Sequence, residues 1–183
     1  PVVSEKLLDM ALGAYWMTKQ MPGAMGEGKY FSSPNDAINA FDYGVIDFRA
    51  KIKVLATDTD KYKQFDNKIF ETTVGRLIFN SVLPSDHLFI NDVVVQRTLF
   101  TVIIDIIDAR GPEAVPPIVD KLKKLGLRYA TKSGTTWGID EVSVPKEKKA
   151  ILDKARAKER EVFDAYDEGL ISREERRRMV VEI

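Results

Sequence analysis

The segment from residue 145 to residue 183 constrains the fold most, because its charged and apolar residues recur with a helical period. Leu152, Ala155, Glu159, Val162 and Tyr166 follow a 3-4-3-4 spacing, with one acidic interruption, inside a surface rich in Lys, Glu, Arg and Asp. Such a pattern predicts a solvated helix with one narrow apolar edge. That edge must pack against a second helix.

A helix break and a second helix start follow directly. The stretch Asp167-Glu168-Gly169-Leu170-Ile171 interrupts the pattern, and Ser172-Arg173-Glu174-Glu175 has the spacing of a capping box. The sequence therefore predicts an antiparallel helical hairpin. Since its second arm has at most about three turns of ~3.6 residues, we expect the hairpin to be incomplete and the chain to be part of a longer polypeptide.

Apolar periodicity predicts helices in the rest of the chain as well. Residues 4–18 place Leu8, Ala11, Leu12 and Tyr15 on one helical face, with Ser4 as N-cap. Further helices are expected from Pro34 to Gly44, from Val93 to Arg110 as a buried helix, and from Pro116 to Gly126 as the second arm of a helical hairpin.

Two segments are instead typical of strands. Ala50–Thr57 alternates polar and apolar residues in its first half, and Ile69–Val74 is rich in β-prone residues. The polar span 58–68 would join them as an extended hairpin loop. We therefore expect an α+β fold, mostly helical, with small β-hairpin elements and a C-terminal antiparallel helical hairpin of coiled-coil type.

The composition excludes several classes of protein. Lys+Arg and Asp+Glu are 28 each, so no net field attracts nucleic acid or acidic lipid. Cysteine is absent and there is one histidine, which excludes thiolate catalysis, disulfides and Cys/His zinc sites. No apolar run approaches the ~20 residues of a membrane span, so we expect a cytoplasmic protein without membrane contact.

The residues that carry chemistry elsewhere favour structural roles here. His87 with Ser81 or Ser85 as nucleophile is a weak hydrolase hypothesis, because neighbours in sequence seldom reach that geometry. The Asp58-Thr59-Asp60 stretch is expected to be solvated rather than to bind a metal ion.

Two further motifs resemble phosphate or nucleic-acid sites. The glycines of the 23–28 loop match neither a Walker sequence nor a dinucleotide fingerprint. Arg173 and Arg176–Arg178 concentrate positive charge, but interleaved glutamates favour a solvated or protein-binding face. These residues together predict a scaffold with a projecting hairpin.

Eight stretches in register resemble one family, the bacterial DNA-directed RNA polymerase β′ subunit, just downstream of its magnesium-binding loop. They are Asp9–Thr18, Gly26–Phe31, Ala50–Val54, Thr72–Arg76, Leu125–Gly134, Gly138–Glu141, Pro145–Lys149 and Gly169–Arg176. Each motif alone is weak. Their common order along nearly the whole chain makes the resemblance specific.

The resemblance implies a role for each region. Residues 1–92 would be a pore-like region lining the secondary channel, 93–144 a funnel-like helical region, and 145–183 the rim-helix hairpin. Gre-type and DksA-type factors dock on that hairpin in this family, and the partner-binding residues expected here are Tyr166, Asp167, Glu168, Leu170, Ile171 and Arg176. Other implied partners are the remaining polymerase subunits, nucleotide substrates that pass the channel, and DNA and RNA through the complete enzyme.

The resemblance also implies that no catalytic, cofactor-binding or metal-binding residue lies in this segment. Magnesium would be bound by the complete enzyme outside it, and the isolated segment would not catalyse nucleotidyl transfer. One alternative remains open, a free-standing helical adaptor whose hairpin pairs with a partner helix.

Overall fold

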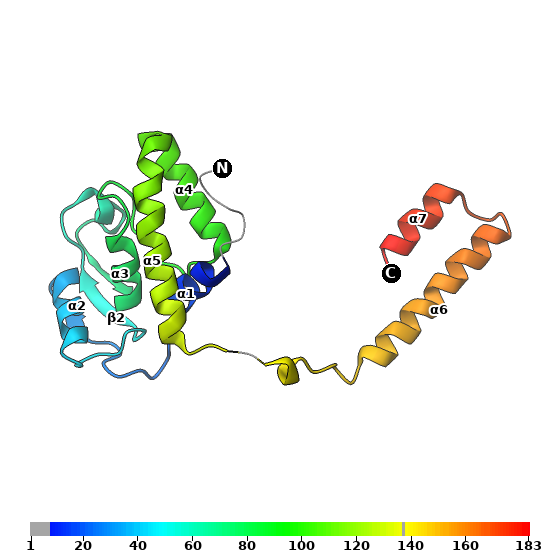
Figure 1. Cartoon of the computed structure of the whole chain (residues 1–183), viewed down its shortest axis with the longest axis horizontal. Helices are drawn as coiled ribbons and strands as arrows, with labels where there is room; N and C mark the ends of the chain where they lie inside the picture. Colours follow the sequence, from blue (N-terminus) through cyan, green and yellow to red (C-terminus); the bar gives the residue numbers. More distant parts are fainter. Residues whose placement is uncertain (1–7, 137) are drawn as a thin grey trace. The chain divides into compact units, whose positions relative to one another are not determined.

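The chain forms two compact units in a computed structural model that describes residues 8–136 and 138–183. The first unit extends to Thr135 and the second begins at Thr136. Helices predominate and the described strands form one small sheet (Figure 1). The expected α+β, mostly helical fold class is thus confirmed.

The first unit combines a three-stranded sheet with α-helices. Its helices are α1 (Leu8–Thr18), α2 (Pro34–Asp42), α3 (Val74–Ser81), α4 (Gln96–Arg110) and α5 (Val115–Ser133), with 3-10 turns η1 (Asp60–Phe65) and η2 (Pro112–Ala114). Ser33 caps α2 as expected, because its Oγ accepts a hydrogen bond from the Asp36 amide at 3.1 Å. The α4–α5 helical hairpin was also predicted and is visible in Figure 1.

The sheet contains the predicted β-hairpin and one strand that was not predicted. Strands β2 (Ile52–Leu55) and β3 (Ile69–Thr72) pair antiparallel, with Leu55 opposite Ile69. Strand β1 (Tyr30–Phe31) pairs parallel to β2. A two-residue strand carries no period of its own, so no sequence pattern could reveal it.

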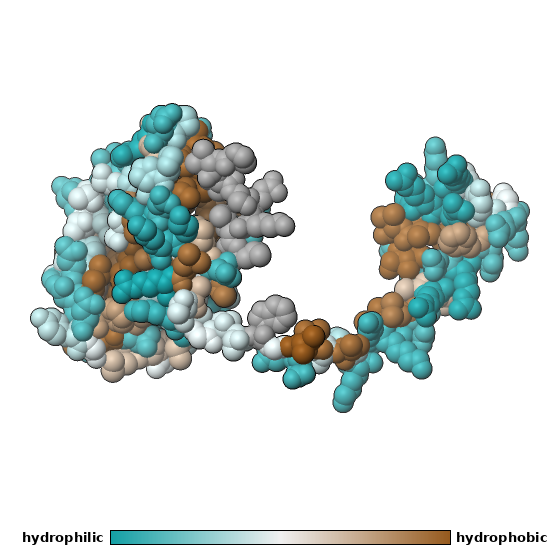
Figure 2. All heavy atoms as spheres, in the orientation of Figure 1, coloured by the Kyte–Doolittle hydropathy of each residue, from teal (hydrophilic) through white to brown (hydrophobic). Residues whose placement is uncertain are grey.

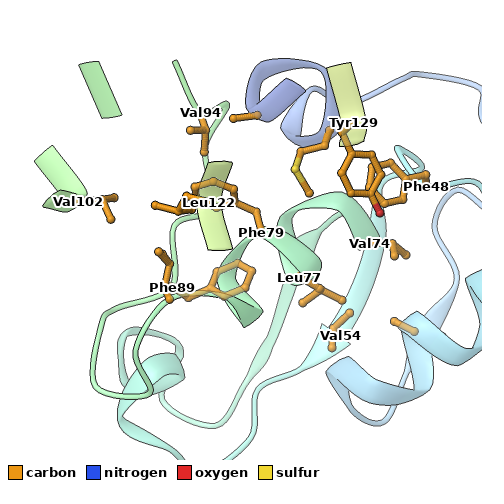
Figure 3. Close-up of a cluster of buried hydrophobic side chains, with 14 of the residues drawn as sticks. Phe48, Val54, Val74, Leu77, Phe79, Phe89, Val94, Val102, Leu122 and Tyr129 are labelled. Atoms are coloured by element: carbon orange, nitrogen blue, oxygen red, sulfur yellow. The ribbon is translucent and has the colours of Figure 1, made fainter. Parts of the chain in front are cut away.

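One continuous apolar core holds this unit together. Figure 3 shows the core side chains converging from helices and strands far apart in sequence, with Phe48 against Tyr129. The two ring centroids lie 4.8 Å apart, and Trp16 stacks on Phe48 at 5.9 Å. Phe79 on α3 and Val94 before α4 are fully enclosed. The helices therefore share one packing unit with the sheet.

The face of α1 that is buried differs from the expected one. Tyr15 is 39% exposed, whereas Ala14 and Met17 are buried, and the side chains of Ser4 and Leu8 lie outside the described residues. The prediction placed Tyr15 on the buried face, but α1 buries Ala14 and Met17 and approaches α5 closely at Gly13. An added Cβ on Gly13 would lie 1.8 Å from the carbonyl oxygen of Gly126 on α5.

Gly126 was expected to end its helix, and this was wrong. It lies buried in the middle of α5, which ends instead at Gly134 with φ of +61°. Glycine is needed at this position because a Cβ added there would lie 2.8 Å from Cα of Met10 on α1. Tertiary contact, rather than helix termination, explains this residue.

Two further expectations about this unit need correction. Residues 69–74 were expected to form a strand, but β3 ends at Thr72 and Val74 begins α3, where Thr73 Oγ1 accepts a hydrogen bond from the Arg76 amide at 3.2 Å. Helix α4 is present but only half-enclosed, with Leu99 and Val102 buried and Ile104 55% exposed. Because Ile residues occur on both faces of this helix, the sequence pattern did not distinguish the buried face from the exposed one.

The second unit is the predicted helical hairpin. A 3-10 turn η3 (Ile139–Glu141) precedes α6 (Lys148–Asp167), and α7 (Arg173–Val181) folds back against α6. Among the described residues of this unit, Val162 of α6 is the apolar residue that is buried. The unit is therefore held by a narrow seam and not by a broad core.

Candidate functional site: the tip of the helical hairpin

The tip of the hairpin has a defined backbone conformation. At the end of α6 the amide of Leu170 donates to the Ala165 carbonyl at 2.9 Å, and the amide of Gly169 donates to the Tyr166 carbonyl at 3.0 Å. This pair of bonds is a Schellman motif, which requires a left-handed residue, and Gly169 supplies it with φ of +76°. The position of Leu170 is thus fixed by the backbone.

The capping box restarts the helix two residues later, as predicted. Ser172 Oγ accepts from the Glu175 amide at 3.3 Å, and the Ser172 amide donates to Glu175 Oε2 at 2.8 Å. That backbone donor, together with the Ser172 hydroxyl, holds the pKa of the Glu175 carboxyl below its ordinary value. The turn between the helices is therefore closed by hydrogen bonds at both ends.

Arg176 joins the two helices through aromatic contacts. Its guanidinium carbon lies 4.3 Å from the ring centroid of Tyr166 and 5.1 Å from that of Phe163. Sequence reasoning included Tyr166 and Arg176 but missed Phe163. The i, i+3 spacing of the two rings on α6 was the available signal, since residues three apart share a helix face.

The six expected partner-binding residues all lie at this end of the hairpin. Asp167 and Glu168 are exposed at the end of α6, Leu170 is 72% exposed, and Ile171 is half-buried. Tyr166 and Arg176 are half-buried and contact each other between α6 and α7. An apolar residue is thus displayed beside carboxylates on a fixed turn.

A shallow groove continues from the tip along α7. It is lined by Phe163, Arg173, Glu174, Arg176, Arg177, Val180 and Val181. Its charged lining consists of three arginines and one glutamate, and its apolar lining of Phe163, Val180 and Val181. Figure 2 shows brown apolar side chains next to teal hydrophilic ones on this hairpin.

The structure does not assemble the weak hydrolase site. Ser81 Oγ donates to the Ile78 carbonyl at 2.7 Å, and His87 Nδ1 lies 2.8 Å from the Leu88 carbonyl oxygen. No hydrogen bond joins His87 to Ser81 or Ser85 among the described residues. A serine nucleophile activated by His87 is therefore not present in this arrangement.

The other candidate motifs are also accounted for by local structure. Asp58 and Asp60 are exposed, and within residues 8–136 and 138–183 no three His, Asp or Glu side chains gather to hold a metal ion. In the glycine loop the amide of Gly28 donates to the Lys51 carbonyl at 2.7 Å, and that of Gly23 donates to Glu27 Oε2 at 2.7 Å. These amides bind the protein itself.

No helix in the described part of the chain is both long and apolar enough to cross a membrane.

Comparison with known proteins agrees with the family resemblance that the eight motifs indicated. Residues 7–142 match the family described as RNA polymerase Rpb1, domain 3.

Curated relatives named DNA-directed RNA polymerase subunit beta' extend the match to the hairpin. That of Sulfurihydrogenibium sp. (strain YO3AOP1) is 38% identical over 175 residues, which cover 96% of this chain and 10% of the relative. That of Acidothermus cellulolyticus is 38% identical over 188 residues, covering 96% and 14%. That of Thermoanaerobacter sp. (strain X514) is 38% identical over 187 residues, covering 94% and 16%.

The chain thus spans between a tenth and a sixth of the length of these relatives. More than two thirds of its residues match the family. The chain therefore belongs to the family of RNA polymerase Rpb1, domain 3.

Proposed function

We propose that this chain is the segment of a DNA-directed RNA polymerase β′ subunit that lines the secondary channel and carries a docking hairpin for regulatory factors. In this proposal residues 1–92 form the pore-like wall, 93–144 the funnel-like region, and 145–183 the rim hairpin. The family membership and the named relatives support the assignment to β′.

The packing of the first unit is what a channel wall requires. Arg76, which is buried, donates from Nε to the Thr18 carbonyl at 3.0 Å and from Nη1 to the Asn91 carbonyl at 2.5 Å. Asn80 holds the same segment, donating from Nδ2 to the Ile90 carbonyl at 2.9 Å. Satisfied buried networks of this kind make a surface rigid.

The docking role rests on one observation, the exposed Leu170 held on a hydrogen-bonded turn. An apolar side chain that is 72% exposed loses contact with water when a partner covers it. The fixed turn means that little conformational entropy is lost on binding. Nearby carboxylates and the arginine-lined groove of α7 supply the polar rim that surrounds such anchors.

The segment would serve nucleotidyl transfer through access and docking, not through bond-making. Its partners would be the other polymerase subunits, Gre-type and DksA-type factors, and, through the complete enzyme, DNA, RNA and nucleotides. Among the described residues no three His, Asp or Glu side chains gather in a group that could hold a metal ion. In this proposal the catalytic magnesium is bound by residues elsewhere in the complete subunit.

A pull-down with a Gre-type factor tests the docking role. Leu170→Asp combined with Ile171→Asp places two charges at the tip, and we expect binding to fall at least tenfold, since a central apolar anchor is worth about 1–2 kcal/mol or more. The turn itself should survive, because its hydrogen bonds are formed by backbone groups, Ser172 and Glu175.

The matched control is Ile151→Asp combined with Leu152→Asp, another exposed adjacent pair on α6. It lies about four helical turns before the tip, or roughly 20 Å at ~1.5 Å per residue. Binding should be retained in this control. Equal binding of the tip variant and the unaltered chain would refute docking through Leu170.

A further inference from the structure

His87 is a mostly buried histidine with one ring nitrogen committed and the other unsatisfied. Its side chain is 13% exposed, and Nδ1 lies 2.8 Å from the Leu88 carbonyl oxygen. A carbonyl only accepts hydrogen bonds, so Nδ1 must carry the hydrogen. Nε2 is then a bare lone pair in the neutral ring, and it has no protein hydrogen-bond partner among the described residues.

The group nearest to Nε2 is an acceptor as well. Oδ2 of Asp105, on α4, lies 3.7 Å from Nε2. Two acceptors facing each other gain nothing while the imidazole is neutral. A proton on Nε2 converts the pair into a charged hydrogen bond, which is stronger than a neutral one.

The surrounding charges leave Asp105 available for this proton. In the small cavity around His87, Arg110 donates to both carboxylate oxygens of Asp86 and thereby lowers the pKa of Asp86. The Lys61 ammonium does not line this cavity and donates to the Asn80 and Leu83 carbonyls. The charges that line the cavity therefore balance only when His87 is protonated.

We propose that His87 and Asp105 form an acid-responsive latch between the 84–89 segment and α4. Protonation at Nε2 creates a hydrogen bond to the Asp105 carboxylate and fastens the segment to the second half of α4. Loss of the proton releases that bond while the Asp86–Arg110 pair stays in place. This inference concerns the fold of the first unit and does not depend on the proposed channel role.

The latch can be tested by titrating the imidazole in the whole chain. Because the chain has one histidine, long-range 1H–15N spectra of the labelled protein report His87 without assignment. At high pH we expect the tautomer with hydrogen on Nδ1. In Asp105→Asn the midpoint of the imidazole titration should move to lower pH by roughly half a unit, since the paired charge is removed.

Asp108→Asn is the matched control, because Asp108 is an exposed aspartate of the same helix that does not line the cavity. It should move the midpoint by less than about 0.2 unit. An Asp105→Asn midpoint no lower than that of the control would overturn the latch. So would a neutral ring with its hydrogen on Nε2.

Hydrogen exchange provides a second measurement. Amide protection in residues 105–110, corrected for the intrinsic rate, should rise between pH 8 and pH 5.5 in the unaltered chain. Aspartates remain ionised over that range. The rise should be lost in His87→Gln, and persistence of the same rise in this variant would contradict the proposal.

Discussion

Arg76 shows how one buried cation organises its neighbourhood. It is 7% exposed, and the described hydrogen bonds of its guanidinium go to uncharged groups of Thr18 and Asn91. Burial lowers its pKa, and Asp92 opposes that shift. The guanidinium thereby ties α1 and the segment before α4 to α3.

Removing this side chain should destabilise the first unit strongly. In Arg76→Met the Thr18 and Asn91 carbonyls lose their buried donor, and we expect a loss of about 2–4 kcal/mol of unfolding free energy. Urea unfolding measures it. Arg97→Met, at an exposed position on α4, should change stability by less than about 0.5 kcal/mol, and equal losses in both variants would contradict this role.

The sequence identified Arg76 only as part of a family-like motif. Its hydrogen-bond partners lie 58 and 15 residues away, so no local pattern could reveal them. Phe163 was missed although it lies three residues before Tyr166 on the same helix, because its partner Arg176 belongs to the next helix. Leu170 and Glu175 were recognised because caps and turns are local chemistry.

Helix termini and helix faces differed in how well they could be predicted. The starts of α2 and α7 followed from Ser33 and Ser172, whose side chains bond to amides within the same turn. The buried face of α1 did not follow, because it depends on the close approach of α5. A glycine inside a helix is ambiguous until the neighbouring helix is known.

The α1–α5 contact supplies a test of that explanation. Ala is normally favoured over Gly in a helix by about 1 kcal/mol, yet Gly13→Ala should destabilise the chain by about 1–3 kcal/mol or more. The added Cβ would meet the Gly126 carbonyl oxygen at 1.8 Å. Both helices would have to separate to relieve that overlap.

Gly138→Ala is the appropriate control for Gly13→Ala. Gly138 has an ordinary negative φ of −102°, and nothing lies within 4 Å of a Cβ added there. Its stability should be nearly unchanged in the same denaturation experiment. If Gly13→Ala were as stable as this control, the close packing of α1 on α5 would be wrong.

The two units differ in how they are stabilised. Among the described residues, all 23 members of the principal core cluster lie between Ala14 and Tyr129, within the first unit. In the second unit Val162 is the buried apolar residue of the described helices. Hairpins with so little burial are only marginally stable, because packing and not propensity provides most helical stability in proteins.

At this scale the charge pattern was sufficient to predict the hairpin. A dense, mixed-sign surface with one narrow apolar edge is incompatible with burial in a core, and this pattern predicts a solvated hairpin within residues 145–183. The arrangement of the first unit was less accessible. Its core joins α1, the sheet and α5, whose contacts span more than 100 residues and leave no local signature.

Limited proteolysis should therefore show that the first unit unfolds cooperatively on its own and that the released hairpin does not. Trypsin is expected to cut first among the exposed Lys146, Lys148 and Lys149, because cleavage requires local opening and those residues carry little packing. The N-terminal product should keep a cooperative thermal transition with Tm within about 2 °C of the uncut chain, since its core is made of its own residues. The released hairpin should lose helical circular dichroism gradually on heating.

A fall in Tm of the N-terminal product by 5 °C or more would contradict this expectation. Such a fall corresponds to roughly 1 kcal/mol or more for a domain of this size, and it would mean that residues 147–183 stabilise the first unit.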